Sequence, residues 1–406
     1  MKRLQTVILV VALALVAAAC TTTGSNTTST STAPPQDTSL DEPDQPARLL
    51  TLDIEGTIRV LSPTGDEIDT IAPGIGARFT QPIWSSQDTI IASEISTTGS
   101  HLTATTVGGD ELWRTPLSTP PFYYIASRGA GTETVLALRN NDGSTGLIAE
   151  SFSAAGDVTS IGDESPFYIT WNPAEDSFAT HVGDRRLDVH ADGIETISSA
   201  ASLFQAPVWL DDGLVTLRTS GSSTFLSLWT GSIFKDLALV RGAARFVGAG
   251  NQIAIQTGIG LDTGGVQALA QSISTIPAGI LTVIDTRSAS FASVTPDVSP
   301  VYQWDPTGTR LLYATFETDP EPALVWHVWE AGATIDFEPF APDPQWFQTV
   351  APFFDQYAQS VSLWAPDGSA FAYPALIDGF PRIFVQDVAE LSPRQIGDGL
   401  WVAFAP

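Results

Sequence analysis

The sequence predicts an all-β fold, a single β-propeller built of four-stranded blades. From residue 48 onward, short strand-like runs alternate with turns of Gly, Asp, Pro and Asn, and no convincing amphipathic helix interrupts them. One strand–turn–strand unit recurs along the chain, and the two ends of the chain hold complementary fractions of such a unit. Short strands at regular spacing are typical of sandwiches, barrels and propellers, and an internal repeat of this length favours the propeller.

The repeat unit is clearest in SLWAPDGSAFAY, residues 362–373, and related units begin at Tyr302, Tyr168 and Gln81. A shortened copy begins at residue 206, and two weak copies begin at residues 123 and 245. In the turn, Pro fixes φ, Asp caps through its side chain and Gly takes the left-handed position. The large residue before the turn can fill the wedge between neighbouring blades. We take these blade anchors to be Trp84, Ile125, Trp171, Trp209, Val247, Trp304, Trp364 and Phe404.

The anchors lie 38 to 60 residues apart, and a four-stranded blade has a period of roughly 40–50 residues. The chain ends in WVAFAP, a first strand with Phe404 as its anchor and no later strands. Residues 48–71 supply three strands that lack a first one. We therefore expect the C-terminal strand to close the blade that the N-terminal strands begin, which removes exposed sheet edges. This closure counts eight blades, and seven remains open because Ile125 and Val247 are weak anchors.

These units resemble those of the TolB-type and WD-repeat-like β-propellers, whose repeat carries W-S-P-D-G followed by I-A-F. The best match is Trp364-Ala365-Pro366-Asp367-Gly368 with Phe371-Ala372-Tyr373. The resemblance covers most of residues 48–406 at the level of the repeat. It implies a fold and leaves the function open, because propellers serve both as enzymes and as binding platforms.

The N-terminus predicts export and a lipid anchor. Lys2 and Arg3 precede an apolar run, residues 7–18, that is too short for a membrane span. Small residues then lead to Cys20, the only cysteine, in a pattern that resembles the bacterial lipobox, although Ala17 stands where Leu is usual. The resemblance implies a signal peptide over residues 1–19, a diacylglycerol on Cys20, and a lipoprotein on the extracytoplasmic side of the membrane. An Asp after the cysteine would resemble an inner-membrane retention signal, and Thr21 stands there.

Residues 20–47 are rich in Ser, Thr and Pro and almost free of apolar side chains. Such a segment cannot bury a core, so we expect a disordered tether. The predicted domains are therefore the signal peptide over 1–19, the lipid-anchored linker over 20–47 and the propeller over 48–406.

The net charge of the chain limits the kinds of partner that it can bind. It carries 45 acidic against 18 basic residues, a net charge of −27. Loss of Lys2 and Arg3 with the signal peptide leaves 16 basic residues and a net charge of −29. So acidic a surface repels nucleic acids and anionic lipid head groups. It attracts cations or a basic partner, or it serves only to keep the protein soluble.

The candidate partner-binding site lies in the overlong segment between Trp304 and Trp364. Its aromatic residues crowd together just before the best repeat, and loops on rigid scaffolds often carry function. F-F-D-Q-Y in this position is similar to segments of extracytoplasmic propellers near ABC-type transport systems. The alternative is that these aromatics plug the propeller channel or pad a blade face. The candidate residues are Trp346, Phe347, Phe353, Phe354, Asp355, Gln356 and Tyr357.

We predict no metal site and no cofactor, although calcium binding by the many acids remains open. Asp188, His190 and Asp192 alternate along one predicted strand, but Asp192-Gly193 also fits a plain turn, so we assign them a structural role. His327 lies between two tryptophans and is typical of blade packing. The sequence contains neither G-x-S-x-G nor H-E-x-x-H.

Three functional hypotheses follow. The first is a monomeric, non-catalytic platform, anchored by lipid, for a protein partner in an envelope or transport assembly. The alternative is an enzyme that acts on a glycan or peptide through a pair of carboxylates in the central funnel. The third is a structural or small-ligand-sensing envelope protein, which the sequence does not distinguish from the first.

Overall fold

The computed structural model describes residues 47–126, 134–140, 147–162, 166–183, 185–201, 206–258, 279–319 and 322–406. The predicted signal peptide, almost all of the tether and Cys20 lie outside these residues, as do residues 259–278, between the anchors Val247 and Trp304. Residues 46–406 form one compact unit. Within the described part of the chain, no helix has the length and apolar character needed to cross a membrane.

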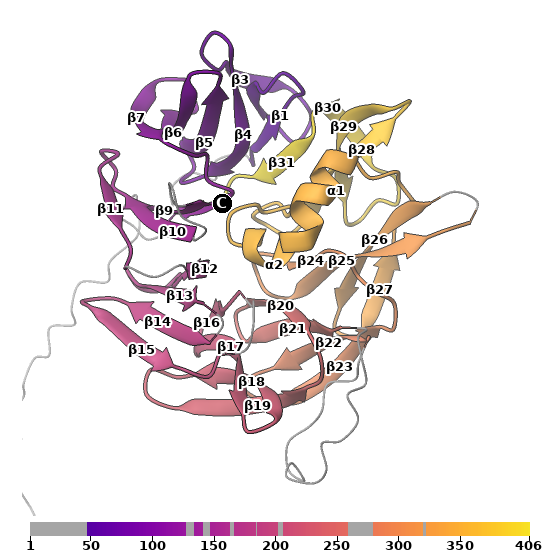
Figure 1. Ribbon diagram of the computed structural model, residues 1–406. Helices are drawn as coiled ribbons and strands as arrows, with labels where there is room; N and C mark the ends of the chain where they lie inside the picture. The colour runs from indigo at the N-terminus through magenta and orange to yellow at the C-terminus, as the bar shows by residue number, and fades with distance from the viewer. Residues whose placement is uncertain are drawn as a thin grey trace, which may run out of the picture. The chain divides into compact units, whose positions relative to one another are not determined.

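The strands form eight sheets arranged around a ring, which confirms the predicted propeller and its eight blades (Figure 1). Blades 1 to 3 consist of β31 (Trp401–Phe404), β1 (Leu49–Leu52), β2 (Ile58–Leu61) and β3 (Glu67–Ile71); β4 (Ala77–Trp84), β5 (Thr89–Ser96), β6 (Gly99–Thr106) and β7 (Glu111–Leu117); and β8 (Tyr123–Ala126), β9 (Val135–Asn140), β10 (Leu147–Phe152) and β11 (Val158–Ser160). Blades 4 and 5 consist of β12 (Pro166–Trp171), β13 (Phe178–Val182), β14 (Arg186–His190) and β15 (Ile194–Ser198); and β16 (Val208–Leu210), β17 (Gly213–Ser220), β18 (Ser223–Trp229) and β19 (Phe234–Val240).

Blades 6 and 7 consist of β20 (Ala244–Ala249), β21 (Gln252–Thr257), β22 (Leu281–Asp285) and β23 (Ser290–Thr295); and β24 (Tyr302–Trp304), β25 (Arg310–Glu317), β26 (Ala323–Glu330) and β27 (Ala333–Asp336). Blade 8 consists of β28 (Ala370–Ile377), β29 (Phe380–Asp387) and β30 (Arg394–Asp398). Its inner strand is reduced to a bridge between Trp364 and Phe371. Between blades 7 and 8 the chain forms α1 (Pro344–Val350), the 3₁₀ turn η1 (Ala351–Phe353) and α2 (Phe354–Tyr357).

The two ends of the propeller close one blade, as the terminal sequences predict. β31 pairs antiparallel with β1, so that Phe404 faces Leu49 and Trp401 faces Leu52. Phe404 is buried in an apolar cluster with side chains of blades 1 and 8. This pairing covers the inner edge of β1, which would otherwise be exposed.

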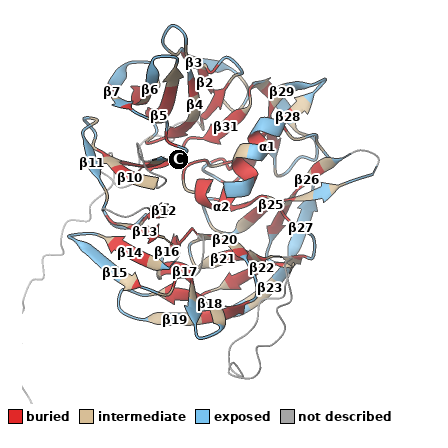
Figure 2. Ribbon diagram, in the orientation of Figure 1, coloured by how far each residue is buried: buried red, intermediate tan, exposed pale blue. Residues whose placement is uncertain are grey.

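Burial follows the position of a strand within its blade (Figure 2). The inner strands β8, β16, β24 and β31 are buried along their whole length, whereas the outermost β11 and β27 are exposed throughout. The core is therefore the stack of inner strands and the wedges between neighbouring blades, where apolar side chains leave water.

The tryptophan anchors do more than fill these wedges. The indole Nε1 of Trp84 donates to the carbonyl of Ala403, at 3.1 Å. Trp209 and Trp364 donate in the same way to the carbonyls of Thr170 and Gln303, at 3.3 and 3.1 Å. Each acceptor is the residue immediately before the anchor of the preceding blade. An indole that fills a wedge and also satisfies a buried carbonyl links two neighbouring sheets.

The Pro-Asp-Gly turn of blade 8 has the geometry expected from its sequence. The backbone N–H of Gly368 donates to the carbonyl of Ala365 at 2.9 Å, and Gly368 has a φ of +68°. Asp367 accepts hydrogen bonds from the backbone N–H and hydroxyl of Ser369. A Cβ at Gly368 would lie 2.8 Å from the carboxylate of Asp305, so both the positive φ and the close contact require glycine.

Candidate functional site

The segment from α1 to α2 closes one end of the propeller channel. Asp343 caps α1 by accepting a hydrogen bond from the backbone N–H of Trp346 at 2.8 Å, and Pro344 occupies the first helical turn. Pro352 lies in the following 3₁₀ turn, η1, and the chain then re-enters helix as α2. We call residues 351–361 the plug.

The plug is held by side chains and backbone of six blades. Its partners include Trp401 of blade 1, Gln81 of blade 2, Tyr123 and Tyr124 of blade 3, Trp171 of blade 4, Arg245 of blade 6 and Gln303 of blade 7. The contacts include Gln81 Nε2 to the Tyr357 hydroxyl at 2.9 Å and the Tyr123 hydroxyl to the carbonyl of Gln356 at 2.8 Å. A short segment with partners around most of the ring is a fixed part of the channel, not a free loop.

The predicted partner-binding residues divide into two groups by their burial. Trp346, Phe354, Asp355, Gln356 and Tyr357 are buried, Trp346 against Trp326 of blade 7 and the other four within the plug. Phe347 is partly buried and Phe353 is 49 % exposed. Of the seven predicted residues, only these two phenylalanines are not buried, so only they could contribute substantially to a contact surface.

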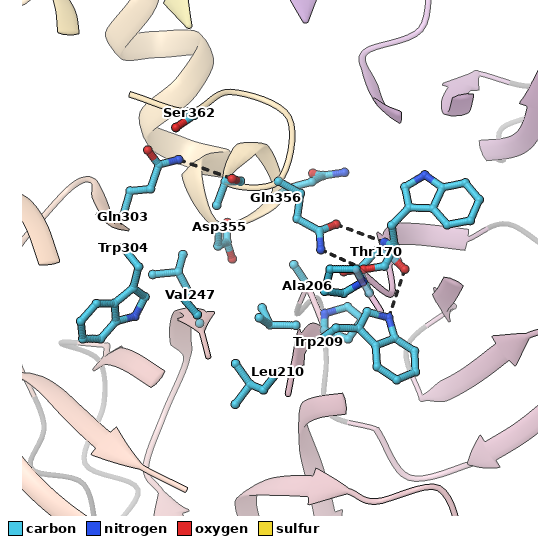
Figure 3. Close-up of a pocket in the computed structure, with 18 of the residues that line it drawn as sticks. Thr170, Ala206, Trp209, Leu210, Val247, Gln303, Trp304, Asp355, Gln356 and Ser362 are labelled. Carbon is cyan, nitrogen blue, oxygen red and sulfur yellow. Dashed lines mark hydrogen bonds between the residues drawn. The ribbon is translucent and has the colours of Figure 1, made fainter. Parts of the chain in front are cut away.

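A cavity of about 320 Å³ lies between the plug and the other end of the channel (Figure 3). Its walls include the inner strands β12, β16, β20 and β24, and its lining extends to the turns that follow them at Pro173, Asp211, Gly250 and Pro306. The side chains of Trp171, Trp209 and Trp304 contribute to these walls together with aliphatic residues. The volume lies at the lower end of the range for small-molecule sites, which are typically mostly apolar with a few polar groups.

Most polar side chains of the cavity already bond within the protein. Gln359 accepts from the backbone N–H of Trp171 and donates to its carbonyl, both at 3.2 Å. Gln303 donates to the carbonyl of Val361 and accepts from the backbone N–H of Leu363, both at 2.8 Å. Asp305 accepts from the backbone N–H groups of Thr309 and Arg310 at 2.8 and 3.0 Å. These groups hold the walls together and have little capacity left for a ligand.

Asp355 and Gln356, both on α2, differ from these groups, and the lining also contains unpaired buried atoms at Thr170, Trp171 and Trp304. Asp355 is only 8 % exposed, and its side chain points from α2 toward Val247 (Figure 3). Burial raises the pKa of the Asp355 carboxyl, while the nearby charge of Arg245 and the backbone N–H groups of residues 355 and 356 oppose this shift. The side-chain Nε2 of Gln356 is buried and has no hydrogen-bond partner among the described residues.

Arg245 is directed to the plug backbone. Its guanidinium donates to the carbonyl of Ala351 at 2.9 Å and to that of Pro352, and it lies over the ring of Phe354, 5.3 Å from the centroid. It does not belong to the cavity lining. The lining contains three aspartates, Asp211, Asp305 and Asp355, and no Lys, Arg or His among the residues that the structure describes.

The histidine positions singled out in the sequence are engaged in cross-strand contacts. Asp188 pairs with Arg186 at 2.9 Å, and the ring Nε2 of His190 lies 2.9 Å from the hydroxyl of Thr180. Burial lowers the pKa of His190. His327 stacks on the ring of Tyr313. Across the described ranges, no group of three or more His, Cys, Asp or Glu side chains is placed to hold a metal ion.

Sequence reasoning identified Asp355 and Gln356 but missed the cavity that they face. Trp171, Trp209 and Trp304 were recognised only as anchors, because the repeat pattern assigns each one to its own blade. The one sequence feature that could have indicated the cavity is the presence of aliphatic anchors, Ile125 and Val247, in place of tryptophan. A small anchor where a tryptophan is usual leaves space at the channel wall, and Val247 lines the cavity.

Comparison with known proteins supports the fold alone. No family model matches the sequence, and the search of curated proteins finds no match. Among solved structures, apo AztD from Citrobacter koseri is similar with a TM-score of 0.52 and 12 % identity, over 89 % of this chain and 98 % of that chain. A structure from a study of two prolyl endopeptidases matches with a TM-score of 0.51 and 11 % identity, over 82 % of this chain and 50 % of that chain.

TolB from Acinetobacter baumannii is also similar, with a TM-score of 0.39 and 13 % identity over 82 % of this chain and 84 % of that chain. At identities this low, such similarities define only the class of the protein, a β-propeller, and no particular function.

Proposed function

We propose that this protein is an exported, lipid-anchored β-propeller that binds a small ligand in its central channel. The observation that carries the proposal is the cavity between the plug and the inter-strand turns, whose lining includes the buried Asp355 carboxylate, to which no described side chain donates, and the unpaired buried amide Nε2 of Gln356. A protein interior is normally close-packed, and buried polar groups are normally paired. A cavity that departs from both rules at one place is best explained as a binding site.

A cavity-filling variant tests this proposal. Val247→Phe places a ring in the space that Val247 borders, and it should abolish ligand binding while the propeller remains folded. Ile233→Phe is the matched control, because Ile233 is exposed on blade 5 and does not line the cavity. Protein purified gently from its own cell envelope would be examined by native mass spectrometry for a bound compound. A small molecule retained by the wild type and the control but not by Val247→Phe supports the proposal, and equal retention by all three contradicts it.

The proposed location follows from the N-terminal residues. Lys2, Arg3, the apolar run and Cys20 support export and lipid attachment on the extracytoplasmic side. Cys20→Ser should release the protein from the membrane fraction and remove the mass of the acyl chains. Retention of the Cys20→Ser protein in washed membranes would show that something other than the lipid anchors it.

A protein partner remains a second candidate because the plug side of the propeller exposes aromatic rings. Phe353 is 49 % exposed, Phe316 at the end of β25 is 56 % exposed, and the rings of Phe316 and Phe347 meet edge to face at 6.1 Å. Exposed aromatics mark contact surfaces more often than isolated aliphatic residues do. This surface would serve the platform function in an envelope or transport assembly.

The structure restricts the mutations that test this second candidate. Alanine at Phe354 or Tyr357 would disturb the buried plug, so the double variant Phe347→Ala/Phe353→Ala is the informative one. Crosslinking from the wild-type surface in native membranes should capture one dominant protein that the double variant loses. Identical captures from both proteins would remove the aromatic surface from consideration.

The enzyme hypothesis stays a prediction, and the cavity lining limits the carboxylates that could form the catalytic pair. Of the three aspartates that line the cavity, Asp305 is occupied with the turn of blade 7. A pair of carboxylates for glycan or peptide chemistry would therefore have to be Asp355 and Asp211.

A further inference from the structure

We infer that the channel ligand is a small organic cation, whose ammonium group pairs with Asp355 while its carbon part contacts the tryptophan-lined walls. This inference rests on the proposed function and names the class of ligand for the same cavity. Four features of the described residues support it, and each concerns the charge or polarity that a ligand would meet.

The first feature is the carboxylate itself. Asp355 is more than nine-tenths buried and is directed into the cavity, and no side chain among the described residues donates a hydrogen bond to it (Figure 3). An ionised carboxylate in an apolar site is costly unless a counter-charge accompanies it. The nearby Arg245 is bonded to the plug backbone and forms no ion pair with Asp355, so a cationic ligand would supply a direct contact that Arg245 does not.

The second feature is the absence of positive groups from the lining. The described residues that border the cavity include no Lys, Arg or His, and the neighbouring Arg245 already bonds to the plug backbone. An anionic ligand would meet Asp355 without a compensating cation. The lining therefore selects against carboxylates and phosphates.

The third feature is the composition of the walls. Trp171, Trp209 and Trp304 line the cavity, and an indole is the aromatic side chain that attracts a cation most strongly. The remaining wall residues are largely aliphatic, so they favour a ligand with a carbon skeleton. A metal ion is a poor fit, because one free carboxylate among indoles does not provide the several oxygen or nitrogen ligands that it needs.

The fourth feature is the electrostatic field around the entrance of the cavity. Asp211 lies in the turn after β16 at the end of the channel opposite the plug; its side chain is mostly exposed, and its carboxylate lies 4.0 Å from the guanidinium of Arg287, which also pairs with Asp212. The chain as a whole carries a net charge of −27. A cleft in a strongly acidic protein concentrates cations and accelerates their association. The buried amide Nε2 of Gln356 would in addition match an oxygen on the same ligand.

The test uses isosteric probes that differ only in charge. Choline and benzylamine carry the cation, 3,3-dimethylbutan-1-ol and benzyl alcohol are their neutral counterparts, and benzoate and glucose represent anions and sugars. Binding to the full propeller would be measured by calorimetry and by tryptophan fluorescence. The variants are Asp355→Asn, the cavity-filling Val247→Phe, and the control Asp367→Asn, which removes one charge from a turn outside the cavity.

We expect at least one cation to bind roughly tenfold or more tightly than its neutral counterpart, a difference of about 1.4 kcal/mol. Asp355→Asn should abolish this preference, and Asp367→Asn should retain it. Tighter binding of a neutral or anionic probe, or cation binding that is the same in Asp355→Asn, overturns the inference while the proposed function stands. If no probe of any class binds and the native protein carries no compound that Val247→Phe loses, the proposed function itself fails.

Discussion

The junctions between blades are of two kinds, and the difference between them locates the candidate site. Trp84, Trp209 and Trp364 donate their indole N–H to a carbonyl of the preceding blade. Trp171 and Trp304 are also buried anchors, yet neither indole N–H has a partner among the described residues. We call the first kind hydrogen-bonded junctions and the second kind unbonded junctions.

The anchor of the preceding blade separates the two kinds. Hydrogen-bonded junctions follow the aromatic anchors Phe404, Trp171 and Trp304, whereas unbonded junctions follow the aliphatic anchors Ile125 and Val247. Both unbonded tryptophans line the cavity. At the first of these junctions, the Tyr124 carbonyl, which the pattern assigns to Trp171, accepts from Ser360 of the plug instead. Interruptions of a regular pattern are expected where a protein binds something.

The largest expected effect concerns the aromatic anchor that closes the ring. Phe404→Ala should lower the free energy of unfolding by about 3–5 kcal/mol, because it leaves a void beside the terminal strand pair. Val247→Ala should cost clearly less, since fewer buried atoms are removed and the site already borders a cavity. Urea unfolding followed by tryptophan fluorescence measures both. Equal losses would show that the two kinds of anchor do not differ in packing.

A matched pair of tryptophan variants tests the hydrogen bond itself. Trp364→Phe and Trp304→Phe remove the same atoms from buried anchors, but only Trp364 donates to a carbonyl. Trp364→Phe should therefore be the more destabilising by about 1 kcal/mol, because it removes a buried hydrogen bond that Trp304 does not make. The same unfolding experiment measures the difference. If Trp304→Phe is as costly, its indole has a partner, such as a bound water.

A pH series distinguishes the cavity carboxylate from a paired one. The pKa of Asp355 is raised from its ordinary value of 3.8, so its contribution to stability is present below that value and is lost as the pH rises through the raised pKa. Asp355→Asn cannot ionise. It should therefore match the wild type in acid and become the more stable protein toward neutral pH, as measured by thermal unfolding without ligand.

Asp188→Asn is the control for that series, because Asp188 is equally buried but pairs with Arg186 and accepts from the hydroxyl of Thr196. This substitution should destabilise the protein at neutral pH. If Asp355→Asn behaves in the same way, Asp355 has a structural partner and does not await a ligand.

The smallest expected effect is at the exposed end of the plug. Phe353→Ala should change the free energy of unfolding by less than about 0.5 kcal/mol, as is usual for an exposed position. The neighbouring Phe354→Ala should cost about 3–5 kcal/mol, since Phe354 packs on Tyr302 with ring centroids 4.4 Å apart. A large loss from Phe353→Ala would show that the 3₁₀ turn is part of the core.

The sequence by itself determined the propeller and the closure through Phe404, and it favoured eight blades over the seven that the weak anchors left open. Antiparallel strands within a blade are neighbours along the chain, so alternation, a large anchor and a Pro-Asp-Gly turn within about 40 residues suffice to define each unit. The same local pattern predicted that an aromatic segment interrupts the repeat between blades 7 and 8, and it identified Asp355 and Gln356 as candidates.

Only the tertiary structure decided where that segment lies and what it encloses. Gln81 meets Tyr357 across 276 positions of the chain, and Tyr123 meets Gln356 across 233. No periodicity links residues so far apart, because their contact depends on the diameter of the closed ring. The cavity likewise exists only where the inner strands of separate blades converge above the plug. The ring that brings them together also removes the Asp355 carboxylate from water, and this burial is the physical reason that its ionised form is unfavourable without a directly bound cation.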